Sequence, residues 1–218
     1  MRLQSAIFDM DGTLLDSMGM WRSLGRDLLL RHGVQPPADL DERLQYRNMM
    51  EGLALCKEIG NLPGTTEELL AEIWDHVVDF YHNRVQPKPG VVKFLSLLKM
   101  EGVWMYIATA TDRPLVEAAL RCAGIDGYFR GIVTTQEAGQ GKRDGPAVYE
   151  RALRRLRSGK KDTVVFEDVL HAVQTAKAAG FRVAAVYDPY EENQEALRRL
   201  ADYYIQSFEE MFSSEVLE

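Results

Sequence analysis

The sequence predicts an α/β protein whose core is a doubly wound parallel sheet, with an all-helical cap domain inserted into it. Three observations support this fold class. Short apolar runs rich in β-branched residues recur along the chain, segments with helical periodicity separate the later runs, and residues 17–85 contain no strand-like run. Strands that alternate with helices favour a parallel sheet covered by helices on both faces.

Five segments have the composition of buried strands. Each is short, shows little alternation of polar and apolar residues, and ends at or beside a polar residue. Near-continuous apolar runs of this kind are typical of strands buried on both faces. The predicted strands are SAIFDM at 5–10, VWMYIATA at 103–110, GIVTT at 131–135, DTVVFED at 162–168 and RVAAVYD at 182–188.

Three segments between or after these strands have recognisable helix ends. Asp112 and Pro114 predict the start of one helix, which Gly124 ends. Pro146 opens a second helix, and a third runs from about residue 169 to Gly180. Proline is favoured in the first turn of a helix and glycine just past its end, so these residues mark boundaries.

The stretch from 17 to 85 reads as helical throughout. Trp21, Leu24 and Leu28 form an apolar stripe that stops at Gly33. A second helical stretch, RLQYRNMMEGLALCKEIG, covers 43–60, and a third, at 65–85, begins with the capping box TTEE at 65–68. We therefore expect a core domain of residues 1–16 and 86–218 and a helical cap domain of residues 17–85, which could close over a site at the strand ends.

Composition narrows the class of protein. The chain has 218 residues, 46% of them hydrophobic, and its 26 basic and 33 acidic side chains give a formal charge of −7. Scattered acidic residues argue against a nucleic-acid partner, which would need a basic face. Cys56 and Cys122 lie far apart, as expected of buried cysteines in a reducing compartment. The N-terminus lacks a signal-peptide core and no apolar run approaches about 20 residues, so we expect a cytoplasmic protein without a membrane partner.

Polar residues gather where the predicted strands end. Asp9 and Asp11 follow the first strand, Thr109 and Thr111 end the second, Lys142 and Arg143 follow the third, and Glu167 and Asp168 end the fourth. The carboxyl ends of parallel strands meet at one edge of the sheet, so these side chains should converge there.

Four carboxylates in one cleft repel one another unless a cation lies among them. Carboxylate and carbonyl oxygens suit Mg²⁺, and the absence of His and Cys from these loops argues against zinc. The sequence therefore predicts a magnesium site. Asp168 could in addition cap the following helix.

These residues carry a family resemblance. DMDGTLLD, the Thr that ends the second strand, a Lys before a helix led by Pro, and FEDVLHAVQTAKAAG resemble the four motifs of the haloacid dehalogenase superfamily. The likeness is specifically to its β-phosphoglucomutase-like branch, which has a helical cap after the first motif. The resemblance implies a Rossmannoid core and a Mg²⁺-dependent phosphoric monoester hydrolase that works through an aspartyl-phosphate.

The resemblance also implies roles for individual residues. Asp9 would be the nucleophile, and Asp11 would protonate the leaving oxygen and then activate water. Mg²⁺ would be held by Asp9, the backbone carbonyl of Asp11 and Asp168, with Glu167 as a further ligand or a neighbour of the ligands.

Phosphate binding would fall to other residues at the strand ends. Thr109 and the Ala110 amide would bind phosphoryl oxygens, and Lys142 would neutralise charge on the phosphoryl group and on Asp9. The family usually has Lys three residues before the Pro, a place that Arg143 occupies here, while Lys142 precedes Pro146 by four. We predict that Lys142 is the working cation, because a guanidinium does not replace a compact ammonium. Arg143 is the alternative and is expected near the phosphate.

Four activities fit this motif set to different degrees. A phosphatase leads, and a β-phosphoglucomutase-like mutase, which returns the phosphoryl group to a sugar, comes second. Thr13 favours the phosphatase because the resembling mutases tend to have Val there, and Trp21 stands where they have His. A dehalogenase would need neither Asp11 nor Asp168. A catalytically silent binding module on this fold is the remaining alternative.

The expected substrate is a compact metabolite such as a sugar phosphate or a nucleoside monophosphate, because a helical lid of the predicted size favours a small substrate. Trp21 is expected to line the substrate pocket, and Arg22, Arg47 and Asn48 could contact the leaving group. Trp74 and Trp104 are expected in the core. The oligomeric state is not predicted.

Overall fold

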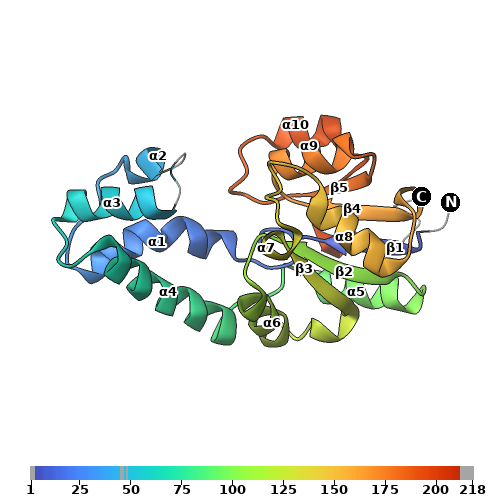
Figure 1. Cartoon of the computed structure of the whole chain (residues 1–218), viewed down its shortest axis with the longest axis horizontal. Coiled ribbons are helices and arrows are strands. Elements are labelled where there is room, and N and C mark those ends of the chain that lie inside the picture. The colour runs from blue at the N-terminus through green and yellow to red at the C-terminus, as the bar shows by residue number, and fades with distance from the viewer. Residues whose placement is uncertain (1–2, 45–46, 48, 212–218) are drawn as a thin grey trace.

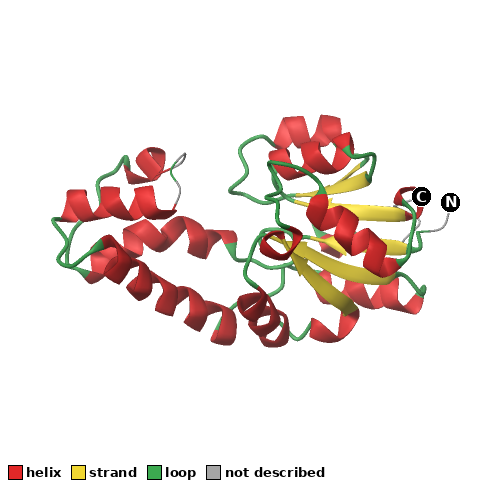
Figure 2. Ribbon diagram, viewed as in Figure 1, coloured by secondary structure: helices red, strands yellow, loops and turns green. Residues whose placement is uncertain are grey.

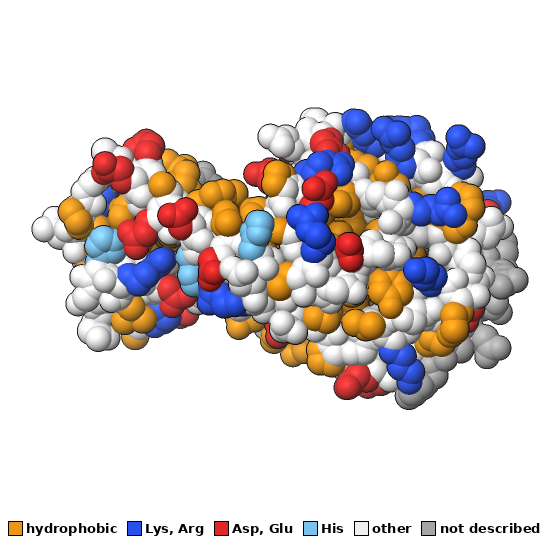
Figure 3. Space-filling view, turned by 90° about the horizontal axis from the view of Figure 1, so that it is seen from below, with side chains coloured by type: hydrophobic (Ala, Val, Ile, Leu, Met, Phe, Trp, Pro, Cys, Tyr) orange, Lys and Arg blue, Asp and Glu red, His pale blue; other side chains and the backbone are white. Residues whose placement is uncertain are grey.

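The computed structural model describes residues 3–44, 47 and 49–211, which form two lobes (Figure 1). The larger lobe contains the sheet and the smaller contains the helices inserted after its first strand. A space-filling view shows a waist between the two lobes (Figure 3). Among the described residues, no helix has the length and apolar character needed to cross a membrane.

The sheet confirms the predicted fold class. Its six strands lie in the order β3-β2-β1-β4-β5-β6, and all neighbouring pairs are parallel. The five predicted strands are present, and a sixth of three residues was too short to predict. The strands are β1 (Ser5–Phe8), β2 (Trp104–Thr109), β3 (Phe129–Thr134), β4 (Thr163–Glu167), β5 (Arg182–Val186) and β6 (Tyr203–Ile205).

Helices cover both faces of the sheet (Figure 2). On one face lie α5 (Val91–Met100), α6 (Arg113–Cys122) and the short helix η3 (Phe208–Glu210). The other face carries α8 (Ala147–Leu156), α9 (Leu170–Ala178) and α10 (Gln194–Leu200). The two faces have separate apolar clusters, and within β1 Phe8 packs into the first and Ile7 into the second. Both faces of the central strands are therefore buried, which explains their continuous apolar composition.

The smaller lobe contains α1 (Met18–Arg31), α2 (Leu40–Leu44), α3 (Met49–Gly60) and α4 (Thr66–Asn83). The predicted capping box starts α4: Thr65 Oγ1 accepts from the Glu68 amide, and the Glu68 carboxylate accepts from the Thr65 amide. The two segments that connect the lobes run side by side, because the Asp16 amide donates to the Gln86 carbonyl over 3.0 Å. The division into domains at these segments stays a prediction.

Some local predictions were wrong. The helical stretch predicted at 43–60 is interrupted, because α2 ends at Leu44, Arg47 lies in neither helix and α3 begins at Met49. Asn48 lies outside the described residues. Trp74 and Trp104 are not in the core: their exposed fractions are 38% and 42%. Arg130 stacks on the Trp104 ring at 3.4 Å from its centroid, and Trp74 lines a cavity described below.

Of the two cysteines, Cys56 is buried as expected but Cys122 is only half-buried.

Candidate active site

The predicted polar residues meet at the carboxyl edge of the sheet, where β1 lies between β2 and β4. This edge is the switch point of the sheet, since the chain crosses to opposite sides of β1 there. A cavity of about 590 Å³ opens at this point, between the sheet and the helices of the smaller lobe. The predicted site residues that line this cavity are Asp9, Asp11, Trp21, Thr109, Ala110, Lys142, Arg143 and Asp168.

Three carboxylates form a compact acidic cluster. Asp9, Glu167 and Asp168 each offer one oxygen, and these oxygens lie within 4.8 Å of one another. All three residues are buried, and burial together with the charge of Asp9 raises the pKa of Asp168 well above its usual range. Glu167 Oε2 is buried without a hydrogen-bond partner among the described residues. An oxygen-only cluster with an unpaired buried oxygen fits a hard divalent cation such as Mg²⁺.

Lys142 lies inside this cluster. Its Nζ is 2.6 Å from Asp9 Oδ1 and 2.7 Å from Glu167 Oε1. Burial lowers the pKa of Lys142, but the carboxylates of Asp9 and Glu167 outweigh this effect and hold the pKa above its usual value. The ammonium therefore stays charged at neutral pH. Arg143 is exposed at the cavity rim. That Lys142 and not Arg143 is the working cation stays a prediction.

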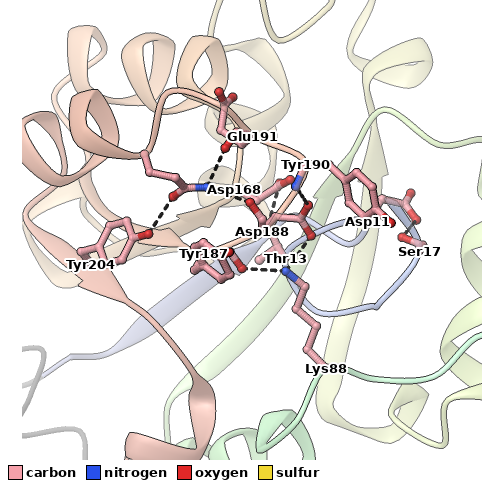
Figure 4. Close-up of polar contacts among 11 residues, drawn as sticks. Asp11, Thr13, Ser17, Lys88, Asp168, Tyr187, Asp188, Tyr190, Glu191 and Tyr204 are labelled. Atoms are coloured by element: carbon pink, nitrogen blue, oxygen red, sulfur yellow. Dashed lines mark hydrogen bonds and ion pairs between the residues drawn. The ribbon is translucent and has the colours of Figure 1, made fainter. Parts of the chain in front are cut away.

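Asp11 is held apart from the acidic cluster by three hydroxyl groups. Ser17, Tyr81 and Thr111 donate to its carboxylate over 2.6, 2.5 and 2.6 Å (Figure 4 shows the Ser17 contact). Burial raises the pKa of Asp11, although these hydrogen bonds oppose the change. The Asp11 carboxyl is thus both fixed in direction and biased toward its protonated form.

Tyr81 comes from α4 and is fully buried, and its hydroxyl accepts from Trp21 Nε1 over 2.9 Å. Sequence reasoning missed Tyr81 as a site residue. Its position on the apolar stripe of α4 is the same as that of a core residue, so the sequence contains no signal that separates the two roles.

Gly12 and Thr13 shape the turn after Asp11. Gly12 has φ +74, and a Cβ at this position would lie 2.2 Å from Asp168 Oδ2. Only glycine combines this backbone conformation with such a close approach to a carboxylate. Thr13 is fully buried and donates to Asp168 Oδ1 over 3.1 Å (Figure 4). Gly12 therefore leaves room for the Asp168 carboxylate beside the turn, and Thr13 holds the carboxylate there.

The loop after β2 faces the acidic cluster across the cavity. Thr109 is buried, its Oγ1 accepts from the Thr111 amide over 3.2 Å, and Ala110 lies between these two residues. That Thr109 and the Ala110 amide bind phosphate stays a prediction. Trp74 and His171 also line the cavity, although neither was expected there. Trp74 was missed because α4 reaches the cavity only through the packing of the two lobes.

Comparison with known sequences gives this site a context. The profile of the haloacid dehalogenase-like hydrolases matches residues 6–186, from β1 to the end of β5. A phosphorylated carbohydrates phosphatase of Thermotoga maritima is 28% identical over 178 residues, which cover 82% of this chain and 82% of that protein. Hexitol phosphatase B of Escherichia coli is 25% identical over 219 residues, covering 99% and 97%.

Among solved structures, a candidate β-phosphoglucomutase of Thermotoga maritima superposes with a TM-score of 0.86 at 26% sequence identity. The superposition covers 98% of this chain and 98% of that one. The likeness therefore extends over both lobes and is not confined to the sheet.

Proposed function

This chain belongs to the haloacid dehalogenase-like hydrolase family, and on that premise we propose that it is a Mg²⁺-dependent phosphatase of small phosphorylated metabolites. One observation carries the proposal: Asp9 lies at the end of β1 in an acidic cluster, with the ammonium of Lys142 2.6 Å away. A carboxylate so placed faces the cavity and can approach an anionic phosphoryl group, because the neighbouring positive charge reduces the repulsion.

In the first step, a carboxylate oxygen of Asp9 attacks phosphorus, and the bond between phosphorus and the leaving oxygen breaks. Asp11 gives its proton to that oxygen, so the leaving group departs as a neutral alcohol and Asp9 carries the phosphoryl group. The raised pKa of Asp11, caused by burial, supports this role because a general acid must hold its proton before the reaction.

In the second step, the ionised Asp11 takes a proton from a water molecule, whose oxygen attacks the phosphorus of the aspartyl-phosphate. The bond to Asp9 breaks and inorganic phosphate leaves. Both aspartates then have the protonation states with which they began.

The donor set of the site fits Mg²⁺. Asp9, Asp168 and the backbone carbonyl of Asp11 would hold the ion, and the unpaired oxygen of Glu167 supports a part for that residue in the cluster. When bound, Mg²⁺ neutralises charge on the phosphoryl group and on the carboxylates around it.

Other residues of the cavity would bind the phosphoryl group. The Thr109 hydroxyl and the Ala110 amide are proposed to donate to its oxygens, and Arg143 is proposed to bind it from the rim. Trp21 would contact the leaving group, since it lines the cavity from the side of α1.

A small metabolite is proposed as the substrate because the smaller lobe covers the cavity. The names of the relatives point the same way, toward phosphorylated carbohydrates and hexitol phosphates. A sugar phosphate and a nucleoside monophosphate both remain within this class.

A sugar-phosphate mutase is the second candidate, favoured by the likeness to the candidate β-phosphoglucomutase. Trp21 weighs against it. The indole Nε1 donates to Tyr81 and, unlike a histidine, does not exchange a proton near neutral pH. We therefore place hydrolysis first.

The test is phosphate release from a panel of small phosphomonoesters, with Mg²⁺ and with excess chelator, for the wild type and for Asp9→Asn. We expect chelator to abolish release and Asp9→Asn to lower kcat at least ~1,000-fold, because the covalent step is lost. Asp16→Asn, the same change at an exposed aspartate of the same segment, is the control and should retain activity within about twofold.

Two results would overturn the proposal. Phosphate release that persists in excess chelator would show that the reaction does not need Mg²⁺. Phosphate release that survives Asp9→Asn would show that Asp9 is not the nucleophile. Isomerised sugar phosphate without release of free phosphate would favour the mutase over the phosphatase.

A further inference from the structure

We propose that the cavity takes phosphomonoesters whose leaving group is an uncharged planar ring, which lies against Trp74 and beside Trp21. This inference rests on the proposed phosphatase activity and narrows its substrate class. Two independent features support it: the aromatic wall that the smaller lobe presents, and the distribution of charge around the space that the leaving group would fill.

The wall that faces the sheet from the smaller lobe is apolar. Its described residues are Met18 and Trp21 from α1 and Trp74 from α4, and Leu115 of α6 also lines the cavity. The exposed fraction of Trp74 is 38%, so its side chain is not part of the buried face of α4. A large aromatic side chain left exposed inside a cavity is typical of a ligand-binding surface.

Trp21 is fixed in place. Its Nε1 donates to Tyr81, which in turn donates to Asp11, so the polar edge of the indole is already used. What the ring offers a ligand is an apolar surface. A planar ring gains from such a surface through stacking and burial, whereas an acyclic polyol laid against the indole would gain no hydrogen bond from it to replace those it makes to water.

The charge around the cavity disfavours a second anionic group. Beyond the proposed catalytic carboxylates, Asp112 and Asp144 also line the cavity, and the cations on its described wall are Lys142 and Arg143. Lys142 forms ion pairs with Asp9 and Glu167. Of the remaining charged residues of the described wall, the single cation Arg143 stands beside the two carboxylates of Asp112 and Asp144.

His171 adds no positive charge. Burial, with Arg143 and Lys142 nearby, lowers the pKa of its imidazole below the usual value, so the ring is neutral at pH 7. Arg22 of α1 points elsewhere, because its guanidinium donates to the Tyr190 carbonyl over 2.9 Å. A bisphosphate or a phosphorylated carboxylic acid would therefore place its second anion beside Asp112 and Asp144.

The experiment compares kcat/KM for esters that share one phosphate and differ in the leaving group. The ring-bearing probes are uridine 5′-monophosphate and phenyl phosphate, and the others are sorbitol 6-phosphate, fructose 1,6-bisphosphate and phosphoglycolate. We expect the wild type to prefer at least one ring-bearing probe by about tenfold or more, as stacking on one aromatic side chain typically supplies.

Three variants locate the effect. Trp74→Leu keeps an apolar side chain without the ring and should lower kcat/KM for the preferred ring ester about tenfold, with less than about twofold change for sorbitol 6-phosphate. Trp74→Phe should restore most of the loss. Trp104→Leu makes the same change at a tryptophan of similar exposure at the start of β2, away from the cavity, and should leave all values unchanged.

A binding measurement separates this inference from the proposed function. Calorimetric titration of the Mg²⁺-loaded Asp9→Asn variant with the same probes reads affinity without turnover. Ring-selective binding that Trp74→Leu weakens, with no phosphate released by the wild type, would overturn the phosphatase and leave the inference standing. Hydrolysis with equal or better use of the polyol or the bisphosphate, or an equal effect of Trp74→Leu on every ester, would overturn the inference and leave the phosphatase.

Discussion

Lys88 Nζ lies 2.8 Å from Asp188 Oδ2, and this ion pair joins the segment returning from the smaller lobe to the loop after β5 (Figure 4). Asp188 is buried and Lys88 nearly so. Lys88 Nζ also donates to the Tyr187 carbonyl over 2.8 Å, and the Tyr190 amide donates to Asp188 Oδ1 over 3.0 Å. The pair therefore fixes one of the two connecting segments against the sheet.

Asp188→Asn should lower the free energy of unfolding by about 2 kcal/mol, because it leaves the buried ammonium of Lys88 without its counter-charge. Denaturant unfolding followed by circular dichroism measures the change. Glu195→Gln is the control, since the Glu195–Arg199 pair is highly exposed and its loss should cost less than about 0.5 kcal/mol. Equal losses in the two variants would show that burial does not strengthen the Lys88–Asp188 pair.

Lys142→Met should lower kcat/KM on the order of 100-fold or more, while Arg143→Met should lower it less than about tenfold. The reason is that Lys142 contacts Asp9 and Arg143 lies exposed at the rim, so Lys142 is better placed to stabilise charge during phosphoryl transfer. Steady-state kinetics at saturating Mg²⁺, with circular dichroism to confirm folding, measures both. A larger loss from Arg143→Met would reverse the assignment of the working cation.

Tyr81→Phe should lower kcat about tenfold and change KM little, because the Asp11 carboxyl loses one of the three donors that fix its direction. The indole of Trp21 also loses its acceptor. Tyr128→Phe is the matched control: its hydroxyl bonds Ser96 over 2.8 Å, so the variant loses a hydrogen bond with no contact to the site. If both variants reduce kcat equally, the effect comes from general loosening and not from Asp11.

The polar site residues that the sequence predicted share a property: each lies at the end of a strand or in the connection that follows it, where local composition and chain order are enough to place it. Asp9, Thr109 and Asp168 converge because parallel strands end at one edge. Trp74 and Tyr81 could not be placed in this way. Their helix was predicted correctly, but the face that α4 turns toward the cavity depends on how the two lobes pack, and periodicity identifies only the apolar face.

The choice between Lys142 and Arg143 shows a different limit. The two are adjacent in one loop, and only the path of that loop decides which of them enters the acidic cluster. Asp188 shows a third limit, because a charged residue that ends a predicted strand can serve the site or an ion pair. Here it pairs with Lys88, which is 100 residues earlier in the chain.

The contact between Arg113 and Glu137 gives a prediction for pH dependence. Arg113 Nε lies 2.5 Å from Glu137 Oε1, and Arg113 Nη2 lies 2.9 Å from Glu137 Oε2. The Arg113 hydrogen bonds lower the pKa of Glu137 below its ordinary value of 4.5. A carboxyl whose pKa is lower in the folded state adds stability above its unfolded pKa, and this stability is lost as the pH falls through the folded pKa.

Glu137→Gln should therefore reduce the free energy of unfolding at pH 7 by about 0.5–1 kcal/mol, a modest value because both side chains are partly exposed. Glutamine can still accept from the Thr134 amide in the capping box that starts the short helix α7 (Thr135–Ala138), so the change isolates the charge. The difference between wild type and variant should be constant well above pH 4.5, the ordinary pKa of a glutamate, and should shrink as the pH falls through the lower pKa of the folded carboxyl, because the wild-type side chain becomes protonated there. Denaturant unfolding across this range checks it, and a difference that stays the same at low pH would mean that geometry and not charge makes the contact stabilising.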